Sequence, residues 1–578
     1  MNKFNIILCI GYLMLTGCQS LDKEFRVVMS EEEVKTSFDN VKDLLTGIYS
    51  HLPNGFTSVW GGTGAAMLAS STDESEYTYE TNPIQYYNTG NWNSVNNPDM
   101  VWGDYYKAIR EVNYFLLSTD EINLDPWKLN PSESSQSIYN RYLAEIKRWK
   151  HEARFLRAFY YFELIKRYGG VPLLNNSLTL DEDFSVVKRN TLEECVNFIV
   201  TECDAIKDHL PPSSGIPYVE AEDLGRATRY AALALKSRTL LYAASELFNN
   251  NSWASGYAHP ELISLPTGNR SDRWKAASDA AKELINELED KTLGEYPDIF
   301  LADNFKLPEV ILCRRNGSSN DFERYNSPIG FESGLGGNTP SQNLVDAYEV
   351  IVDAGTTKDF DWNDPVLAKD PYANRDPRLR YTIVTNNSDF GNPSRKVEIW
   401  QGGFDAAPIA NATKTGYYLR KYVQETLDIK QGNNGVHSWV IFRIPEIYLN
   451  YIEALNEWNP GNAEIATYYN KTRNRPGVGM PSLPAGLGQE QVRERIRREK
   501  RIEFAFEDHR MWDVRRWMIA EETLGANLRG VNVASKDKAF AYTPFILENR
   551  IFLPKMYLYP IPQSDINIDG SLIQNPLW

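Results

Sequence analysis

The sequence predicts a mainly α-helical fold, a degenerate tetratricopeptide-like scaffold of helix pairs with a loop-rich, short-strand region packed on it. Two observations lead to this fold class. Apolar residues recur at three- and four-residue spacing in long segments of the first half and again near the C-terminus. Between them, from about residue 295 to 440, the chain is rich in Gly, Pro, Asn and aromatic residues and has only short apolar runs. We find no clean repeat of about 34 residues, so the helix pairs are expected to be degenerate copies.

Helical periodicity predicts the following segments in the two halves of the chain: 99–117, 142–168, 191–206, 223–248 and 273–288, then 441–457, 464–474 and 489–507. In the second of these, Trp149, Ala153, Leu156 and Tyr160 form one apolar stripe. The alanine in that stripe permits close approach of a neighbouring helix. We therefore expect this segment to lie at the centre of the scaffold.

Local signals mark where the predicted helices begin and end. Gly169 and Gly170, followed by Pro172, stop the helix over 142–168. Thr191, with Glu194 three residues later, is the pattern of a capping box and starts the next helix.

The first 17 residues have the pattern of a bacterial lipoprotein signal peptide. Lys3 precedes an apolar run over residues 4–15, and the segment ends in LTGC at Cys18. The run is too short for a permanent helix across a ~30 Å hydrocarbon core, which needs about 20 residues. Small residues before Cys18 fit cleavage there, and we expect the Cys18 thiol to be lipidated. The mature chain is then tethered outside the cytoplasm; an ordinary secretory peptide is the alternative.

The composition limits which classes of partner the chain is expected to bind. Its 578 residues include 61 Lys and Arg against 77 Asp and Glu, a formal net charge of -16, so a phosphate backbone would be repelled and no nucleic acid is expected. After the signal peptide and Cys18, the cysteines that remain are Cys195, Cys203 and Cys313. The first two fall about 12 Å apart on one helix, too far for a disulfide. We interpret all three as small core residues.

The sequence carries no catalytic motif. Its six histidines have no metal-ligand spacing, and neither HExxH nor GxSxG occurs. We expect no metal, no cofactor and no enzymatic activity. A glycosidase carboxylate pair is invisible in one sequence, so a surface hydrolase stays open as an alternative. Asp508 and His509 could suggest a proton relay, but they lie beside Arg510, Arg515 and Arg516, and we favour a structural role.

Aromatic residues are abundant, with 14 Trp, 33 Tyr and 24 Phe, and two clusters lie in polar segments. In residues 77–102, Tyr86, Tyr87 and Trp92 are embedded among Asn88, Asn91, Asn93, Asn96 and Asn97. In residues 314–331, Phe322 and Tyr325 are flanked by Asn320, Asp321, Arg324 and Asn326. Flat rings beside amide and charged groups suit a sugar, which offers a C–H face and hydroxyls. The same surface would suit a peptide, and packing of the loops against the helices is the alternative for each ring.

Ordered motifs along nearly the whole mature chain resemble the SusD/RagB outer-membrane lipoproteins of Bacteroidetes. They are the lipobox at Cys18 and the segments AIREVNYFL (108–116), EARFLRAFYYFELIKRYGGVPL (152–173), PSQNLVDAYE (340–349), PYANRDPRLRYTI (371–383), TGYYLRKY (415–422), RIPEIYLNYIEALNE (443–457), RREKRIEFAFEDHRMWDVRRW (497–517) and the terminal YLYPIPQSDINIDGSLIQNPLW. The chain ends in NPLW where the family usually reads closer to NPGW, a small departure.

The resemblance implies an organisation and a function. It divides the mature chain into an N-terminal SusD-like helical region, 18–295, and a C-terminal RagB/SusD region, 296–578. It implies a cell-surface, lipid-anchored outer-membrane protein that captures oligosaccharides and delivers them to a SusC-like TonB-dependent transporter, which it covers like a lid. Peptide capture, as in the RagB branch, is the alternative. Arg154, Arg157 and Tyr161 are implied to fix helix packing.

The ligand site is placed by this resemblance in the two aromatic clusters. We predict Trp92 and Tyr325 as stacking platforms, with Phe322 in support. Tyr86 and Tyr87 belong to the same predicted surface. Asn91, Asn96 and Arg324 are predicted to donate hydrogen bonds to sugar hydroxyls.

Overall fold

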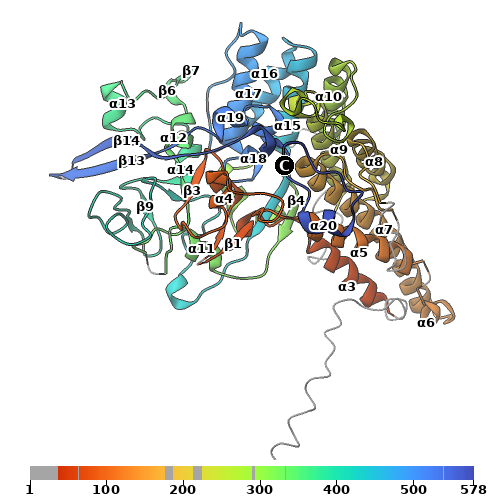
Figure 1. Cartoon of the computed structure of the whole chain (residues 1–578). Coiled ribbons are helices and arrows are strands. Elements are labelled where there is room, and N and C mark those ends of the chain that lie inside the picture. The colour runs from red at the N-terminus through yellow and green to blue at the C-terminus, as the bar shows by residue number, and fades with distance from the viewer. Residues whose placement is uncertain are drawn as a thin grey trace, which may run out of the picture.

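The computed structural model of the chain describes residues 37–62, 64–120, 122–175, 187–212, 224–288, 293–331, 333–537 and 539–578. The predicted signal peptide and Cys18 lie outside these residues. Helices dominate the described part, and its strands are short, which confirms the predicted mainly α-helical class. Figure 1 shows the long helices α7 to α10 together on one side of the molecule, with the strands and loops on the other.

The scaffold is a series of helices in which each packs on the next. Helix α3 contacts α5 and α7, and the chain of neighbours then runs from α7 through α8, α9 and α10 to α15, which also contacts α16 and α17. Their bounds are α3 Phe38–Tyr49, α5 Trp102–Ser118, α7 Glu133–Tyr168, α8 Leu192–Ile206, α9 Arg229–Ala244, α10 Arg270–Glu287, α15 Ile444–Trp458, α16 Ala463–Arg473 and α17 Gln489–Glu503. Because α10 packs on α15, helices from both halves of the chain form one scaffold.

Helix α7 is the centre of this scaffold. Its predicted stripe of Trp149, Ala153, Leu156 and Tyr160 is buried. The helix ends at Gly169, whose φ of 75° lies in the left-handed region, and a Cβ there would fall 2.4 Å from the carbonyl oxygen of Leu262. Only glycine allows that close approach. The predicted end of the helix is therefore confirmed.

Side chains that join α7 to its neighbours have the framework roles implied by the resemblance. Arg154 and Arg157 both donate to Glu202 on α8, at 2.7 and 3.1 Å. The Tyr161 hydroxyl lies 3.2 Å from the carbonyl oxygen of Leu174. The capping box of Thr191 and Glu194 is present at the start of α8, as predicted.

Strands occur as antiparallel pairs, some between neighbouring segments and some between segments far apart in the sequence. The pairs are β1 Val59–Gly61 with β2 Gly64–Ala66, β3 Ser75–Tyr77 with β5 Asn338–Pro340, β4 Val310–Arg315 with β12 Ser438–Arg443, β6 Val350–Asp353 with β7 Thr356–Lys358, β8 Ile383–Val384 with β11 Tyr418–Leu419, β9 Asp389–Phe390 with β10 Arg395–Lys396, and β13 Asn527–Lys536 with β14 Ala539–Asn549. The β3–β5 pair joins the loop-rich region to the N-terminal part of the chain, whereas the β4–β12 pair joins the two ends of the loop-rich region to each other.

Short helices lie between the longer elements along the chain. They are α4 Gln85–Thr89, α6 Asp125–Lys128, α11 Asp321–Asn326, α12 Gln342–Ala347, α13 Pro365–Lys369, α14 Arg378–Thr382, α18 His509–Arg516, α19 Ala520–Thr523 and α20 Gln563–Ile568. The cysteines Cys195, Cys203 and Cys313 are free and buried, as predicted. No described helix combines the length and the apolar character that crossing a membrane requires.

A buried ion-pair network surrounds Glu503, the last residue of α17. Its carboxylate accepts hydrogen bonds from Arg378 at 2.9 Å, Arg443 at 2.6 Å and Arg475 at 3.3 Å. The four side chains are almost completely buried. Burial by itself raises the pKa of Glu503, but the charges of the three arginines outweigh it and lower the pKa to about 2. The network joins α14, β12 and the segment after α16 to the end of α17.

The network predicts the effect of Glu503→Gln. Removing this charge takes a shared partner from three buried guanidinium groups and leaves a buried excess of positive charge, although Glu499, Glu507 and Glu309 still pair with them. The free energy of unfolding at pH 7 should therefore fall by about 3–5 kcal/mol. Glu494→Gln is the matched control on the same helix, because Glu494 is 62% exposed and its pair with Arg497 should contribute less than about 1 kcal/mol. Denaturant unfolding measures both. Equal midpoints for the two variants would contradict the assigned role.

The same pKa predicts how the stability depends on pH. A carboxyl whose pKa falls from 4.5 to about 2 on folding stabilises the protein above pH 4.5 and loses that contribution as the pH falls toward 2. The loss is about 3 kcal/mol for this one group. Glu503→Gln should therefore flatten the acid limb of the stability curve.

Candidate functional site

An aromatic pair is formed by exposed Trp60 on β1 and half-buried Tyr325 on α11. Trp60 on β1 is 60% exposed, and its ring centroid lies 6.1 Å from that of Tyr325 on α11, with the two planes nearly perpendicular. An exposed tryptophan supported by a second ring presents a flat apolar face to solvent. Such faces are suited to ligands that combine an apolar face with polar edges.

The backbone around the pair is fixed by close contacts. The Asn82 side-chain amide lies 3.3–3.4 Å from the carbonyl oxygens of Gly61 and Gly64, which face each other across the β1–β2 pair. A Cβ at Gly64 would fall 2.9 Å from the Tyr325 ring and 3.0 Å from the Tyr77 hydroxyl. Glycine at this position lets Tyr325 pack directly on β2. The aromatic pair is thus built on hydrogen-bonded elements.

Polar groups lie beside the Tyr325 ring on the same short helix. Arg324 and Asp321 are about half exposed, and their charged groups are 3.8 Å apart. Burial, followed by the charge of Asp321, raises the pKa of the Tyr325 phenol, which stays protonated at neutral pH. Donors and an acceptor therefore border an apolar face, the combination that a hydroxyl-rich ring requires.

The structure corrects three of the predicted ligand residues. Trp92 is only 2% exposed, and its ring is surrounded by Tyr87, Tyr559 and Trp578 at centroid distances of 4.7–5.1 Å. Tyr87 and Phe322 are each 6% exposed. Buried rings have no face free for a sugar, so the prediction that these three contact ligand is wrong. They pack the aromatic loops against the body of the protein.

The remaining predicted residues of the first cluster are exposed but lie elsewhere. Tyr86 is 42% exposed. Asn91 and Asn96 are exposed and bond within their own loop: Asn91 donates to Thr89 at 3.2 Å, and Asn96 donates to the Asn91 carbonyl at 3.1 Å. Among the described residues, no hydrogen bond or ring contact joins these three to Tyr325. Their roles stay predictions.

Sequence reasoning missed Trp60. The available signal was a single tryptophan followed by Gly61 and Gly62, outside every helical pattern. Its partner Tyr325 and the adjacent Arg324 were predicted. A single tryptophan lacks the clustering signal on which the prediction relied. Most of the clustered rings are buried, so that signal marked packing instead.

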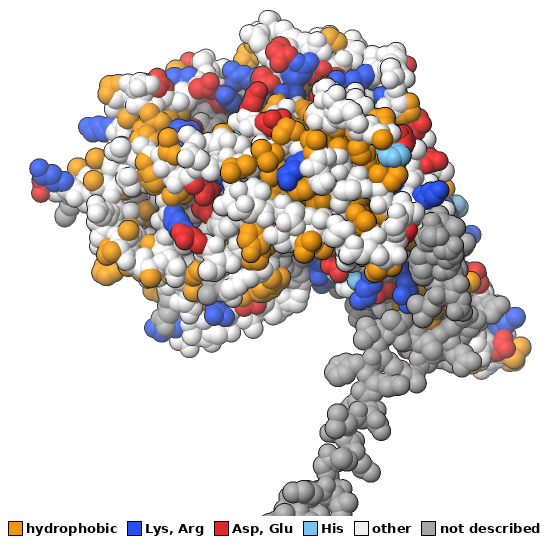
Figure 2. Space-filling model, viewed as in Figure 1, with side chains coloured by type: hydrophobic (Ala, Val, Ile, Leu, Met, Phe, Trp, Pro, Cys, Tyr) orange, Lys and Arg blue, Asp and Glu red, His pale blue; other side chains and the backbone are white. Residues whose placement is uncertain are grey.

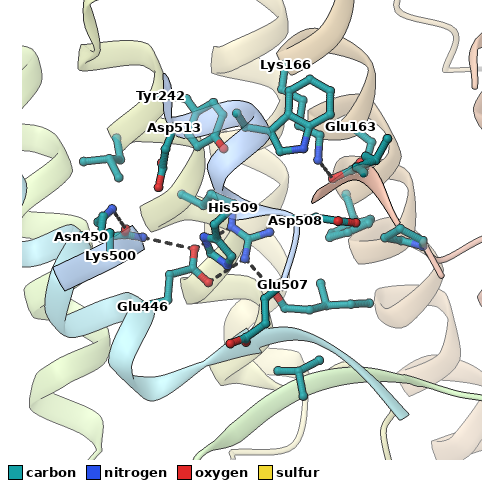
Figure 3. A pocket seen from close by; sticks show the side chains of 18 of the residues that line it. Glu163, Lys166, Tyr242, Glu446, Asn450, Lys500, Glu507, Asp508, His509 and Asp513 are labelled. Carbon is teal, nitrogen blue, oxygen red and sulfur yellow. Dashed lines mark hydrogen bonds and ion pairs between the residues drawn. The ribbon is translucent and has the colours of Figure 1, made fainter. Parts of the chain in front are cut away.

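Asp508 and His509 line a different, enclosed cavity. Figure 3 shows them facing side chains of α7, α15 and α17, including Lys166, Glu446 and Lys500. Burial raises the pKa of Asp508 to about 8 and lowers that of His509 well below its usual value. The imidazole therefore stays neutral, which fits the structural interpretation of this pair. At 60 Å³ the cavity is far below the ~300 Å³ at which small-molecule sites begin.

Charged side chains of both signs are interspersed on the face shown in Figure 2, with hydrophobic ones between them. That face carries no continuous basic track of the kind nucleic acids bind. In the part of the chain that the structure describes, no group of three His, Cys, Asp or Glu side chains is placed to hold a metal ion.

The contrast between Trp60 and Trp92 gives a prediction about stability. Trp92→Ala removes a buried ring and should lower the free energy of unfolding by about 3–5 kcal/mol. Trp60→Ala removes an exposed ring and should change it by less than about 0.5 kcal/mol. Thermal and denaturant unfolding of the two variants measure this. A large loss in Trp60→Ala would show that this ring is structural.

Comparison with known proteins identifies the family. The SusD family model matches residues 308–578, and a second SusD-like model, described as starch-binding and associating with the outer membrane, matches residues 25–241. A SusD-like protein of Formosa agariphila, P25, is 24% identical, and the match covers 96% of this chain and 94% of that protein. A SusD-like protein of Bacteroides ovatus is 22% identical over 74% of this chain and 72% of its own.

Solved structures agree with the sequence comparisons. A SusD-like protein from Bacteroides fragilis superposes with a TM-score of 0.73 at 26% identity, covering 93% of this chain and 97% of that one. A second B. fragilis protein, described as a SusD-like carbohydrate-binding protein, gives a TM-score of 0.71 at 25% identity and covers 93% of this chain and 99% of its own. On these matches, which extend over both halves of the sequence and over the fold, the chain belongs to the SusD/RagB family.

Proposed function

We propose that this protein is a cell-surface glycan-binding lipoprotein that captures oligosaccharides and delivers them to a SusC-like TonB-dependent transporter. The pair of exposed Trp60 and half-buried Tyr325, bordered by Arg324 and Asp321, is the observation that carries the binding role. The starch-binding description of one matching family model and the carbohydrate-binding description of the B. fragilis relative support the same ligand class.

Energetics require more than one contact. A ring pair contributes about 0.5–1.5 kcal/mol, and stacking of a sugar on one ring should be of similar size. Micromolar affinity needs about 8 kcal/mol. An oligomer that covers the Trp60–Tyr325 pair and bonds to the neighbouring polar groups can reach that value, whereas a single sugar unit on one exposed ring cannot.

Binding by this surface is tested with the chain from residue 19, run against a panel of polysaccharides in affinity electrophoresis and calorimetry, with a peptide mixture alongside. Trp60→Ala and Tyr325→Ala should each weaken glycan binding by about tenfold or more, equal to about 1.4 kcal/mol. Trp60→Phe, which keeps a smaller ring, should lose less. Tyr86→Ala tests the other exposed ring separately.

Several results would change the proposal. Unchanged affinity in folded Trp60→Ala would remove this ring from the site. Binding to peptides alone would favour peptide capture instead. Release of reducing ends from a polysaccharide by the purified protein would favour a hydrolase.

The membrane and transporter roles rest on the lipobox at Cys18 and on the family. Cys18→Ala should move the protein from the membrane fraction into the soluble fraction, because acyl chains contribute ~0.8 kcal/mol per buried CH₂ to anchoring. Mild detergent extraction of the unmodified protein should recover a TonB-dependent transporter with it. Recovery of the protein alone would contradict delivery to such a partner.

A further inference from the structure

One short segment of the chain, residues 78–83, contacts the elements that carry both rings of the aromatic pair. Trp60 on β1 and Tyr325 on α11 come from parts of the chain that are far apart in sequence. The segment directly follows β3, which pairs with β5. Hydrogen bonds connect it to the backbone of Tyr325 on one side and to the β1–β2 pair on the other. The placement of one ring relative to the other therefore depends on this segment.

The connection to Tyr325 is made by Thr78. Its backbone N–H donates to the carbonyl oxygen of Gly337 at 2.9 Å, and its hydroxyl donates to that of Gly336 at 2.6 Å. The N–H of Gly337 in turn donates to the carbonyl oxygen of Tyr325 at 2.6 Å. The end of α11 is thus bonded, through one residue, to the start of the segment.

The connection to Trp60 is made by Asn82, which is only 1% exposed. Its side-chain amide nitrogen lies 3.4 Å from the carbonyl oxygen of Val59, 3.3 Å from that of Gly61 and 3.4 Å from that of Gly64. Val59 and Gly61 are the two neighbours of Trp60 in β1, and Gly64 lies opposite Gly61 in β2. One buried amide therefore holds the backbone on both sides of the exposed ring.

Two further contacts fix this amide and the hairpin against it. The Asn82 side-chain oxygen accepts the backbone N–H of Ile84 at 2.9 Å, so the nitrogen is directed to the hairpin. A Cβ on Gly61 would fall 2.3 Å from Cδ of Pro83, so β1 lies directly on the residue after Asn82. A pair of three-residue strands is marginally stable by itself and needs such support.

We infer that Asn82 is a positioning residue for glycan binding: its amide holds β1 so that the Trp60 ring stands at 89° to the Tyr325 ring. The inference rests on the proposed carbohydrate function. Asn82 is buried and acts only through Trp60, whose exposed ring has little packing of its own and follows the backbone that carries it. A hairpin that is loose before binding would have to be ordered by the glycan, which lowers affinity.

The first test needs no glycan. The chain from residue 19 is labelled with 5-fluorotryptophan, and the ¹⁹F NMR signals of Trp60 and Trp92 are assigned with Trp60→Phe and Trp92→Phe. Asn82→Ala should shift or broaden the Trp60 signal and leave that of buried Trp92 in place. Asn82→Ser, which leaves a smaller cavity, keeps the test valid if Asn82→Ala fails to fold. An unchanged Trp60 signal in both variants would overturn the inference.

The second test measures affinity for soluble starch, laminarin and the rest of the polysaccharide panel. Asn82→Ala should weaken binding by about fivefold or more. Asn82→Ala/Trp60→Ala should bind no more weakly than Trp60→Ala alone, because a residue that acts through Trp60 loses its effect with that ring. A further, additive loss in the double variant would overturn the inference, and so would unchanged affinity in Asn82→Ala.

Asn456→Ala is the matched control. Asn456 is also 1% exposed, and its amide donates to the backbone of another segment, at 3.1 Å from the carbonyl oxygen of Gln489, but it lies in the helical scaffold. It should leave both the Trp60 signal and glycan affinity unchanged. Glycan binding that does not respond to Asn82→Ala would leave the proposed function standing, whereas a chain that binds no polysaccharide of the panel would overturn that function and the inference together.

Discussion

Burial of charged groups around Glu503 is the constraint on which the loop-rich region depends. Burying a carboxylate and three guanidinium groups is costly unless every partner is in place. Arg378, Arg443 and Arg475 share the Glu503 carboxylate, and each also pairs with one more buried carboxylate, Glu499, Glu507 or Glu309 respectively. These arginines come from α14, from β12 and from the segment after α16, and helix α14 and strand β12 are both short elements. Their pairing fixes segments that a hydrophobic core of short strands would hold only weakly.

Similar buried pairs connect the helices of the scaffold. Arg238 on α9 binds Glu446 on α15 at 2.6 Å, and Arg516 on α18 binds Glu453 on α15 at 2.8 Å. Helices from the first and last parts of the chain are therefore joined by charge pairs as well as by apolar contact.

Helix α11 is short, yet its side chains have different environments on its two sides. Among its six residues, Arg324 is exposed, Tyr325 is half-buried, and Phe322 and Glu323 are buried. Gly64 permits close contact on the outer side, and Gln424 and His437 fix the inner carboxylate. One short helix thus carries both a partly exposed aromatic ring and a fixed, buried carboxylate.

The sequence by itself determined the scaffold, because helical periodicity and caps are local properties: the α7 stripe, its end at Gly169 and the Thr191–Glu194 box all follow from neighbouring residues. The family followed from ordered motifs along the chain. Only the tertiary structure decided which rings are exposed. Trp92 is buried because Tyr559 and Trp578, from the other end of the chain, enclose it, whereas Trp60 has no such cover and is 60% exposed. The exposure of a side chain depends on contacts between segments that are distant in the sequence. A pattern of neighbouring residues carries no information about those contacts, so it does not predict exposure.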